Sequence, residues 1–338
     1  MLPRSSQDGY SRKMSSAPAS ADAQGQALGW RIPRKALALS VIATLVLGIP
    51  AVAGFAISGV TGVIGVFFGA LVALRPALGM RPLSALGLSI PGALTAAVAV
   101  TVTDQPVAAA SFVALCCLLV APANGISDGL LAAIPSVAAV LVATTTTVSP
   151  AAMIGWMLVG SLVAITLGHW LGPLPMSPGI DSARSWRHAA VMALAVGAVT
   201  YVVLAWHIPH GYWVALTLTV VLRPVGDGTR DKAWARVLGT IGGATAAVVV
   251  APWLPPWAIY TLVTCCVLLA VGYAITKDYA RQIAFVTPPL VLLDASPETT
   301  GLERIGTTIA GALLAAVIAL ALTWWENRDT APKLSPDS

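Results

Sequence analysis

Charged side chains are scarce in this sequence. Asp, Glu, Lys and Arg make up 10% of the 338 residues, against about a quarter in a typical soluble domain. Hydrophobic residues make up 57%, and the mean hydropathy is +0.83, so too few polar side chains are present to cover a soluble surface. The composition instead predicts an all-α, polytopic protein whose solvent is the lipid bilayer.

Residues that bind metals or form disulfides are also few. The cysteines stand as two adjacent pairs, Cys116-Cys117 and Cys265-Cys266, inside apolar runs and without C-x-x-C spacing, so we interpret them as small packing residues. His207 and His210 supply two ligands, and a metal site needs more. We expect polar residues of the membrane interface there, with an outward metal site as the alternative. No cofactor is expected.

Enzyme and nucleic-acid motifs are missing as well. Residues 226–232 lack the spacing of a phosphate-binding loop and follow no strand, so we interpret them as a turn before a helix. No cluster of acid, base and nucleophile recurs at the span ends, so the chain is not expected to be an enzyme. The basic residues form no stripe interleaved with aromatics, which argues against a nucleic-acid partner.

Apolar spans follow a polar N-terminal tail, residues 1–35, whose composition predicts disorder. Most spans are long enough to cross about 30 Å of hydrocarbon. A second tail, 326–338, follows the last of them. The twelve predicted spans are 36–54, 58–75, 82–102, 106–122, 127–147, 150–172, 188–206, 211–224, 236–253, 257–275, 279–294 and 301–325.

Positive charge falls on alternate loops. With a cytoplasmic N-terminus, nearly all loop lysines and arginines lie inside, and only Arg304, beside Glu303, lies outside. Basic residues favour the cytoplasmic side of a membrane, and tryptophans favour span ends, where many lie here. We therefore predict a multi-pass protein of the cell (plasma or inner) membrane with both termini cytoplasmic.

The two halves of the sequence resemble each other at an offset of about 150 residues. Leu74-Arg75-Pro76 matches 222–224, the cysteine pairs match, and Ile154-Gly155 matches Ile305-Gly306, all in the same order. This pattern predicts two six-helix repeats, 36–173 and 188–325, joined by a cytoplasmic linker, 174–187. An even number of spans makes the repeats parallel, which places the natural solute path at their interface.

The most distinctive stretch is Gly211-Tyr212-Trp213, then 222–224, then Arg236 leading into Gly239-Thr240-Ile241-Gly242-Gly243. It resembles the fusaric-acid-resistance-like family, also called integral membrane bound transporters or aromatic acid exporters. The resemblance covers about residues 211–325, with a weaker copy at 58–173. It implies efflux of small organic, often aromatic, acids and a distant kinship with plant anion channels. Members often carry a sizeable cytoplasmic domain, for which the short linker leaves no room.

Four arginines are candidates for a basic inner mouth. Arg75 and Arg223 are equivalent by the repeat, and Arg236 and Arg281 each open a span. Two interpretations stay open. They set the topology by reaching the inner headgroups, or they gather organic anions, because guanidinium pairs bidentately with carboxylate.

Prolines break two spans at related positions, Pro135 in the fifth and Pro288-Pro289 in the eleventh. Broken helices at corresponding positions of two halves indicate a mid-membrane binding site, and a kink that only improves packing is the alternative. Thr287 either donates a hydrogen bond to a substrate or caps its own backbone. Tyr212 and Trp213 are candidates for stacking on a substrate near the outer end.

These features predict a secondary transporter that exports small organic anions, some of them aromatic, between the two repeats. No carboxylate is expected deep in any span, which argues against a proton relay. A passive anion channel, a non-transporting scaffold or partner subunit, and, more remotely, a membrane-embedded enzyme are the alternatives. The expected partners are the bilayer and the organic anion. The chain encloses the path alone or as a homodimer, and the sequence leaves this open.

Overall fold

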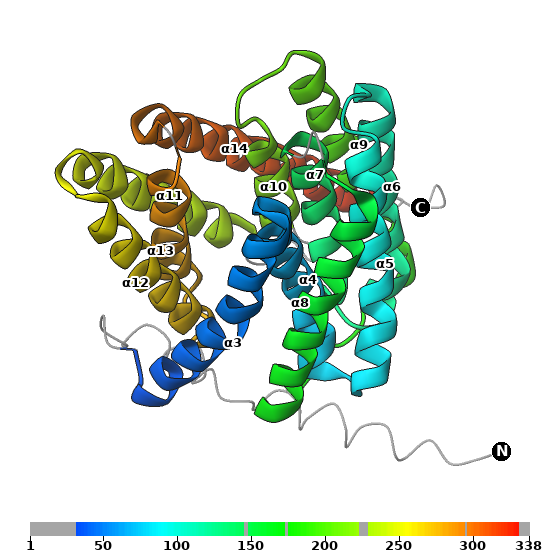
Figure 1. The fold of residues 1–338 in the computed structure, drawn as a ribbon. Coiled ribbons are helices and arrows are strands. Elements are labelled where there is room, and N and C mark those ends of the chain that lie inside the picture. The colour runs from blue at the N-terminus through cyan, green and yellow to red at the C-terminus, as the bar shows by residue number, and fades with distance from the viewer. Residues whose placement is uncertain (1–31, 145–147, 173–174, 223–228, 295, 331–338) are drawn as a thin grey trace, which may run out of the picture.

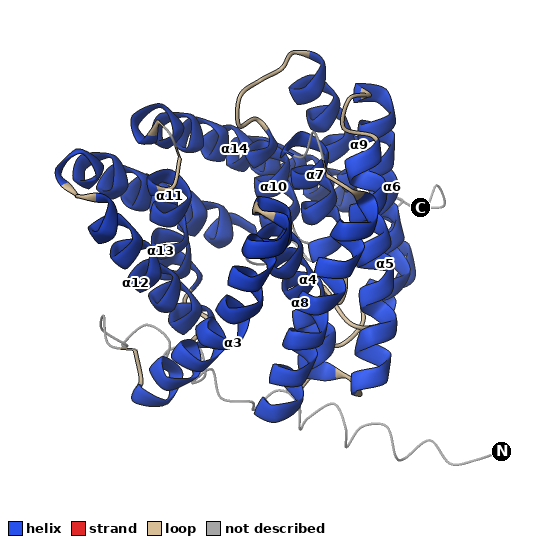
Figure 2. Ribbon diagram, in the orientation of Figure 1, coloured by secondary structure: helices blue, strands red, loops and turns tan. Residues whose placement is uncertain are grey.

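The computed structural model describes residues 32–144, 148–172, 175–222, 229–294 and 296–330 (Figure 1). Within them every regular element is a helix (Figure 2). Most of the predicted N-terminal tail, residues 331–338 and Arg223 lie outside the described residues. In chain order the elements are α3 (Arg34–Ser58), α4 (Val60–Gly79), α5 (Pro82–Thr101), α6 (Pro106–Ile126), α7 (Ala133–Thr144), α8 (Pro150–Leu171), α9 (Ser182–Ala205), α10 (Tyr212–Val221), α11 (Thr229–Val250), the 3-10 helix η1 (Ala251–Trp253), α12 (Pro256–Ile275), α13 (Tyr279–Leu292) and α14 (Pro297–Thr330).

Each predicted span coincides with one of the twelve α-helices of the described chain, but not every helix crosses a membrane by itself. Nine are long and apolar enough to do so. Helices α7, α10 and α13 have 12, 10 and 14 residues, or about 15–21 Å at 1.5 Å per residue. The structure therefore gives nine candidate membrane spans among the twelve described helices, and the other three of the twelve predicted spans correspond to short helices.

Helix α7 is short because its first predicted turns do not form. Residues 127–132 make turns instead, in which Gly129 has a φ of +73° and its N–H donates to Asn124 Oδ1 at 3.1 Å. Pro135 was expected to interrupt a span. It instead occupies the first turn of α7, where a missing N–H breaks no helical hydrogen bond.

Turns and prolines shorten the other two helices. His207 and His210 both have positive φ, near +50°, in the turn before α10, and the backbone is extended again at Leu222. Helix α13 contains Pro288 and Pro289 and ends soon after them. Similarly, Pro76 does not end α4, as the sequence suggested for Arg75-Pro76, since the helix continues to Gly79.

Small residues set the main helix contacts. Helix α4 packs along α8, α6 along α9, α11 along α13, and α14 against both α10 and α11, while α3 lies on α12. A Cβ at Gly160 would collide with the Val66 carbonyl, and one at Gly311 would press on Thr217 and the Val214 carbonyl. Such close approach is typical of membrane helices, where packing replaces the hydrophobic effect.

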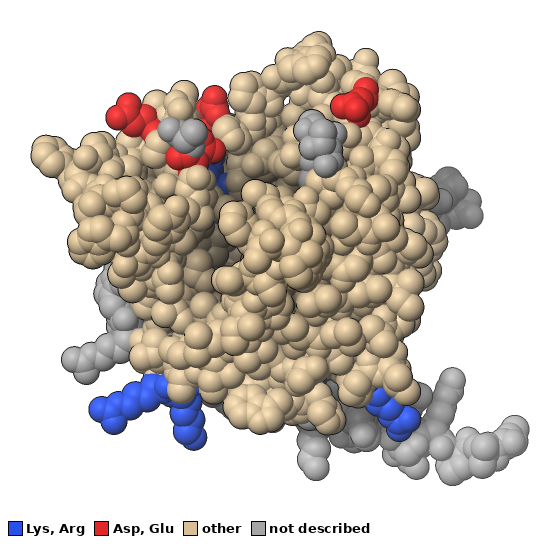
Figure 3. All heavy atoms as spheres, viewed as in Figure 1, with Lys and Arg blue, Asp and Glu red and all other residues tan. Residues whose placement is uncertain are grey.

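On the face that Figure 3 shows, most of the surface charge lies at the two ends of the molecule. In Figure 3 acidic side chains gather at the top, basic side chains at the bottom, and an uncharged belt separates them. Large apolar side chains such as Ile49, Val52 and Phe55 stand 60% or more exposed on α3. Exposed apolar surface of this kind suits lipid rather than water. The chain is a multi-pass membrane protein.

Candidate functional site

A hollow opens in the face seen in Figure 3, between α11 and α3 as placed in Figure 1. Acidic side chains stand at its upper rim, and a small basic surface is visible inside it. Basic side chains in the apolar interior of a membrane protein are energetically costly, and by default they mark a functional site.

The short helix α10 carries this site. Trp213 and Thr217 lie four residues apart on α10, and such residues are neighbours on one helix face. The guanidinium of Arg304, from α14, lies over the Trp213 ring, 3.5 Å from its centroid. Nε of Arg236, from α11, donates to Thr217 Oγ1 at 3.1 Å. Helix α10 thus holds two arginines from two other helices, one turn apart.

Arg304 is only 4% exposed. Among the described residues, its Nε and Nη1 have no hydrogen-bond partner, and no carboxylate forms an ion pair with it. The contact with Trp213 contributes about 2 kcal/mol when it is desolvated. Each buried donor without a partner costs about 1–3 kcal/mol. The ring therefore offsets only part of the cost, which leaves Arg304 suited to an anionic ligand.

Arg236 is 5% exposed and better satisfied. Its Nη1 donates to the hydroxyl of Tyr279 at 3.2 Å, and the Lys232 ammonium lies 5.6 Å from the centre of the same tyrosine ring. Arg236 and Arg304 contact α10 one helical turn apart, through Thr217 and Trp213. Both are the eighth residue of their helices, which places each about 10 Å from its helix start. They approach the middle of the protein on helices that run from opposite ends.

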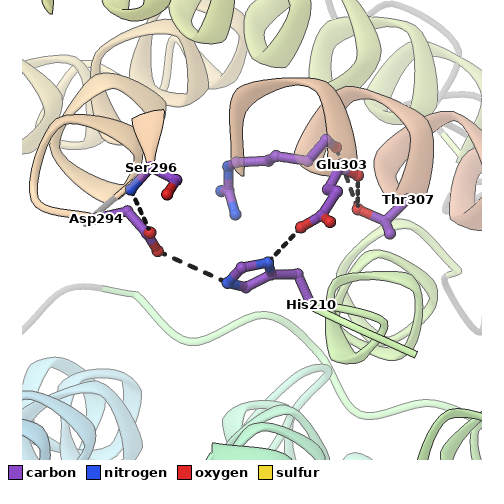
Figure 4. Close-up of polar contacts among 6 residues, drawn as sticks. His210, Asp294, Ser296, Glu303 and Thr307 are labelled. Carbon is purple, nitrogen blue, oxygen red and sulfur yellow. Dashed lines mark hydrogen bonds and ion pairs between the residues drawn. The ribbon is translucent and has the colours of Figure 1, made fainter. Parts of the chain in front are cut away.

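A cluster of His210, Asp294 and Glu303, here called the His210 cluster, lies at the start of α10 and α14 (Figure 4). His210 Nδ1 lies 2.5 Å from Glu303 Oε2, and Nε2 lies 3.7 Å from Asp294 Oδ2. Asp294 also accepts a hydrogen bond from the backbone N–H of Ser296 at 3.1 Å. All three side chains are about one third exposed, so solution reaches the cluster.

The opposite end of α13 carries an ion pair. Arg281 Nη1 lies 2.9 Å from Asp278 Oδ2, and the guanidinium lies 5.7 Å from the centre of the Tyr273 ring. Asp294 follows the other end of the same helix. The 14 residues of α13 therefore separate the Arg281 pair from the His210 cluster by about 21 Å.

The predicted site residues divide into those at this site and those elsewhere. The rings of Tyr212 and Trp213 contact each other at a tilt of 37°, with centres 4.8 Å apart, next to Arg304. Arg236 lies beside them, and Tyr279 connects it to the helix that carries Arg281. Arg75 instead donates to Ser177 Oγ at 2.6 Å, in the segment before α9.

The remaining predicted residues have structural contacts. Thr287 is fully buried, and its hydroxyl donates to the Ile283 carbonyl at 2.9 Å. This is the second of the two roles expected for Thr287, a hydrogen bond to its own helix backbone. Pro288 packs near Gly243 of α11. Pro135 is buried at the start of α7, which reaches α10 through a hydrogen bond of 2.7 Å between Ser136 and Thr219.

Sequence reasoning missed Arg304, Glu303 and the partners of His210. It counted Arg304 only as an outer charge at the start of the span 301–325, whereas Arg304 is buried one third of the way along Pro297–Leu322, a stretch apolar enough to cross a membrane. The available signal was this adjacent Glu-Arg pair inside an apolar run, where charges are rare and functional.

Residues 194–318 match the protein family described as fusaric acid resistance protein-like, which confirms the resemblance found in the sequence. The match runs from α9 into α14 and contains every residue of the site described above. This family indicates a membrane transporter-like protein. Comparison with curated proteins and with solved structures found no match.

Proposed function

We propose that this protein is a secondary transporter that exports small organic anions, aromatic carboxylates among them. The observation that carries the proposal is Arg304, a buried guanidinium with open donors, stacked on Trp213. Guanidinium binds carboxylate through two parallel hydrogen bonds. An aromatic anion that pairs with Arg304 finds the rings of Tyr212 and Trp213 at the same place.

Successive cations define the path. From the basic end, an anion meets Arg281, then Arg236, then Arg304, before it reaches the His210 cluster at the acidic end. The basic end is cytoplasmic in this proposal because lysine and arginine favour that side, which puts both termini inside. Sites in series keep each binding step weak enough for release.

Two repeated halves belong to the same proposal. Gly160 faces the Val66 carbonyl as Gly311 faces the Val214 carbonyl, and α6 packs on α9 as α12 packs on α3. These paired contacts support parallel repeats around an axis along the membrane normal. Helix α10, which touches α7 of the first half, lies where such repeats meet.

The test is efflux of benzenesulfonate from proteoliposomes, because this aromatic anion stays ionised and does not leak as a neutral acid. Arg304→Met should lower the efflux rate at least tenfold. Arg81→Gln, at an exposed arginine, is the control and should leave it unchanged. Equal efflux from both variants would remove Arg304 from the path. Currents that follow only the anion gradient would indicate a channel, and no efflux at all would favour a scaffold.

A further inference from the structure

The His210 cluster has the geometry of a proton-binding site. Both ring nitrogens of His210 face a carboxylate, Glu303 on one side and Asp294 on the other. A neutral imidazole has one N–H donor and one lone pair, and an ionised carboxylate only accepts. One nitrogen of a neutral ring would therefore point a lone pair at an anion. A bound proton replaces this repulsion with a second donor.

The cluster is joined to the anion site by short connections. Glu303 and Arg304 are adjacent residues of α14. His210 is 6.2 Å from Tyr212 between ring centres, and Tyr212 contacts Trp213, which holds Arg304. Because Arg304 is buried, a charge change in the cluster acts on an anion there with less screening than in bulk water.

The other ionisable groups nearby are few. Tyr212 comes from α10 and Arg304 from α14, and Arg236 from α11 lies beyond Arg304. The exposed ionisable groups next to the cluster in sequence are His207, in the turn before α10, and Glu298, in the first turn of α14.

We propose that His210, Asp294 and Glu303 form a proton-binding site that is linked to anion binding at Arg304; this inference rests on the proposed function. A proton on the cluster removes negative charge beside the anion and raises its affinity, and by reciprocity the anion raises the affinity for the proton. The proton moves between solution and the imidazole–carboxylate group, and no covalent bond of the anion changes. Loss of the proton to the outer solution then releases the anion.

The test is the Kd of benzenesulfonate, whose charge is constant, for the full-length protein in detergent between pH 6 and pH 8.5. The wild-type Kd should rise about tenfold across this range, a typical size for coupled sites. Glu303→Gln mimics the protonated acid and should bind tightly at every pH. His210→Asn removes the proton acceptor and should bind weakly at every pH, while asparagine tolerates the positive φ of this position.

Glu298→Gln is the matched control, an exposed glutamate of the same helix, and should keep the wild-type pH dependence. If Glu303→Gln does not fold, Asp294→Asn carries the same test with the same expected outcome. A wild-type Kd that does not change with pH, or a Glu303→Gln slope equal to that of Glu298→Gln, would overturn the linkage alone. Absence of benzenesulfonate binding at every pH would instead refute the proposed function, and the linkage with it.

Discussion

Two helix contacts, α4 with α8 in the first half and α10 with α14 in the second, share a backbone arrangement. They differ in the side chains that occupy them. A glycine faces a valine carbonyl in both, Gly160 with Val66 and Gly311 with Val214. Seven residues before these glycines stand Met153, fully buried, and Arg304. The first contact is closed by apolar packing, whereas the second holds a charge.

The difference extends to the partner helices. Three residues after Val66 is Gly69, which packs against the Met157 backbone, while three residues after Val214 is Thr217, which accepts a hydrogen bond from Arg236. Helix α4 has 20 residues and α10 has 10. One arrangement of helices therefore gives a rigid packed pair in one half and a short helix with two arginines in the other.

The largest change in stability is expected when the buried residues of the two contacts, Met153 and Arg304, are exchanged. Met153→Arg puts a charge without a partner into the closed contact and should lower stability by about 3 kcal/mol, as charges at a bilayer centre do. Arg304→Met, the reverse exchange, should leave stability unchanged or higher, because it removes a poorly satisfied buried charge. Thermal unfolding in detergent measures both, and equal losses in the two variants would contradict the comparison.

The next largest change in stability is expected at the two glycine contacts. A Cβ at Gly160 meets rigid backbone, and the overpacking in Gly160→Ala should cost about 2 kcal/mol. A Cβ at Gly311 would come no closer than 2.7 Å to Thr217 Cβ, against 2.0 Å to the Val66 carbonyl oxygen at Gly160, so Gly311→Ala should cost less. Gly155→Ala faces open space and is the neutral control. Thermal unfolding in detergent measures the stability of the three variants. A Gly311→Ala variant that is less stable than Gly160→Ala would contradict the expected order.

Replacing the Trp213 ring beneath Arg304 tests how much this contact contributes to anion binding. Trp213→Leu removes a contact of about 1–2 kcal/mol, so the Kd for benzenesulfonate should rise roughly tenfold. Trp257→Leu, at a tryptophan that is 72% exposed, should leave the Kd unchanged. An unchanged Kd in Trp213→Leu would show that Arg304 does not need the ring to hold an anion.

The smallest expected effect lies where α7 meets α10. Ser136→Ala removes the hydrogen bond to Thr219, and a neutral hydrogen bond contributes about 1 kcal/mol. Thr101→Ala removes an exposed local hydrogen bond and is the control. Unfolding midpoints that coincide for the two variants would mean that this contact does not couple the halves.

The helices were predictable from the sequence, and the site only in part. Apolar runs bounded by proline mark α5, α6, α8 and α12, each of which begins at a proline. The length of α7 was not predictable, because turns stabilised by contacts distant in sequence, such as Ser127 with Ser177, replace its first predicted turns. The short predicted span 211–224 agrees with α10 within a few residues. Trp213 and Arg236 followed from the family motif. Arg304 did not, because its burial depends on how α14 lies against α10.

The length of α10 has an electrical consequence. Ten residues extend about 15 Å, roughly half of the hydrocarbon thickness of about 30 Å. Backbone groups at both ends of so short a helix need water or protein partners. Where water reaches both ends of α10, the membrane voltage drops over little more than the length of this helix. On the proposed path, the step of an anion from Arg236 to Arg304 is therefore the step on which the voltage acts.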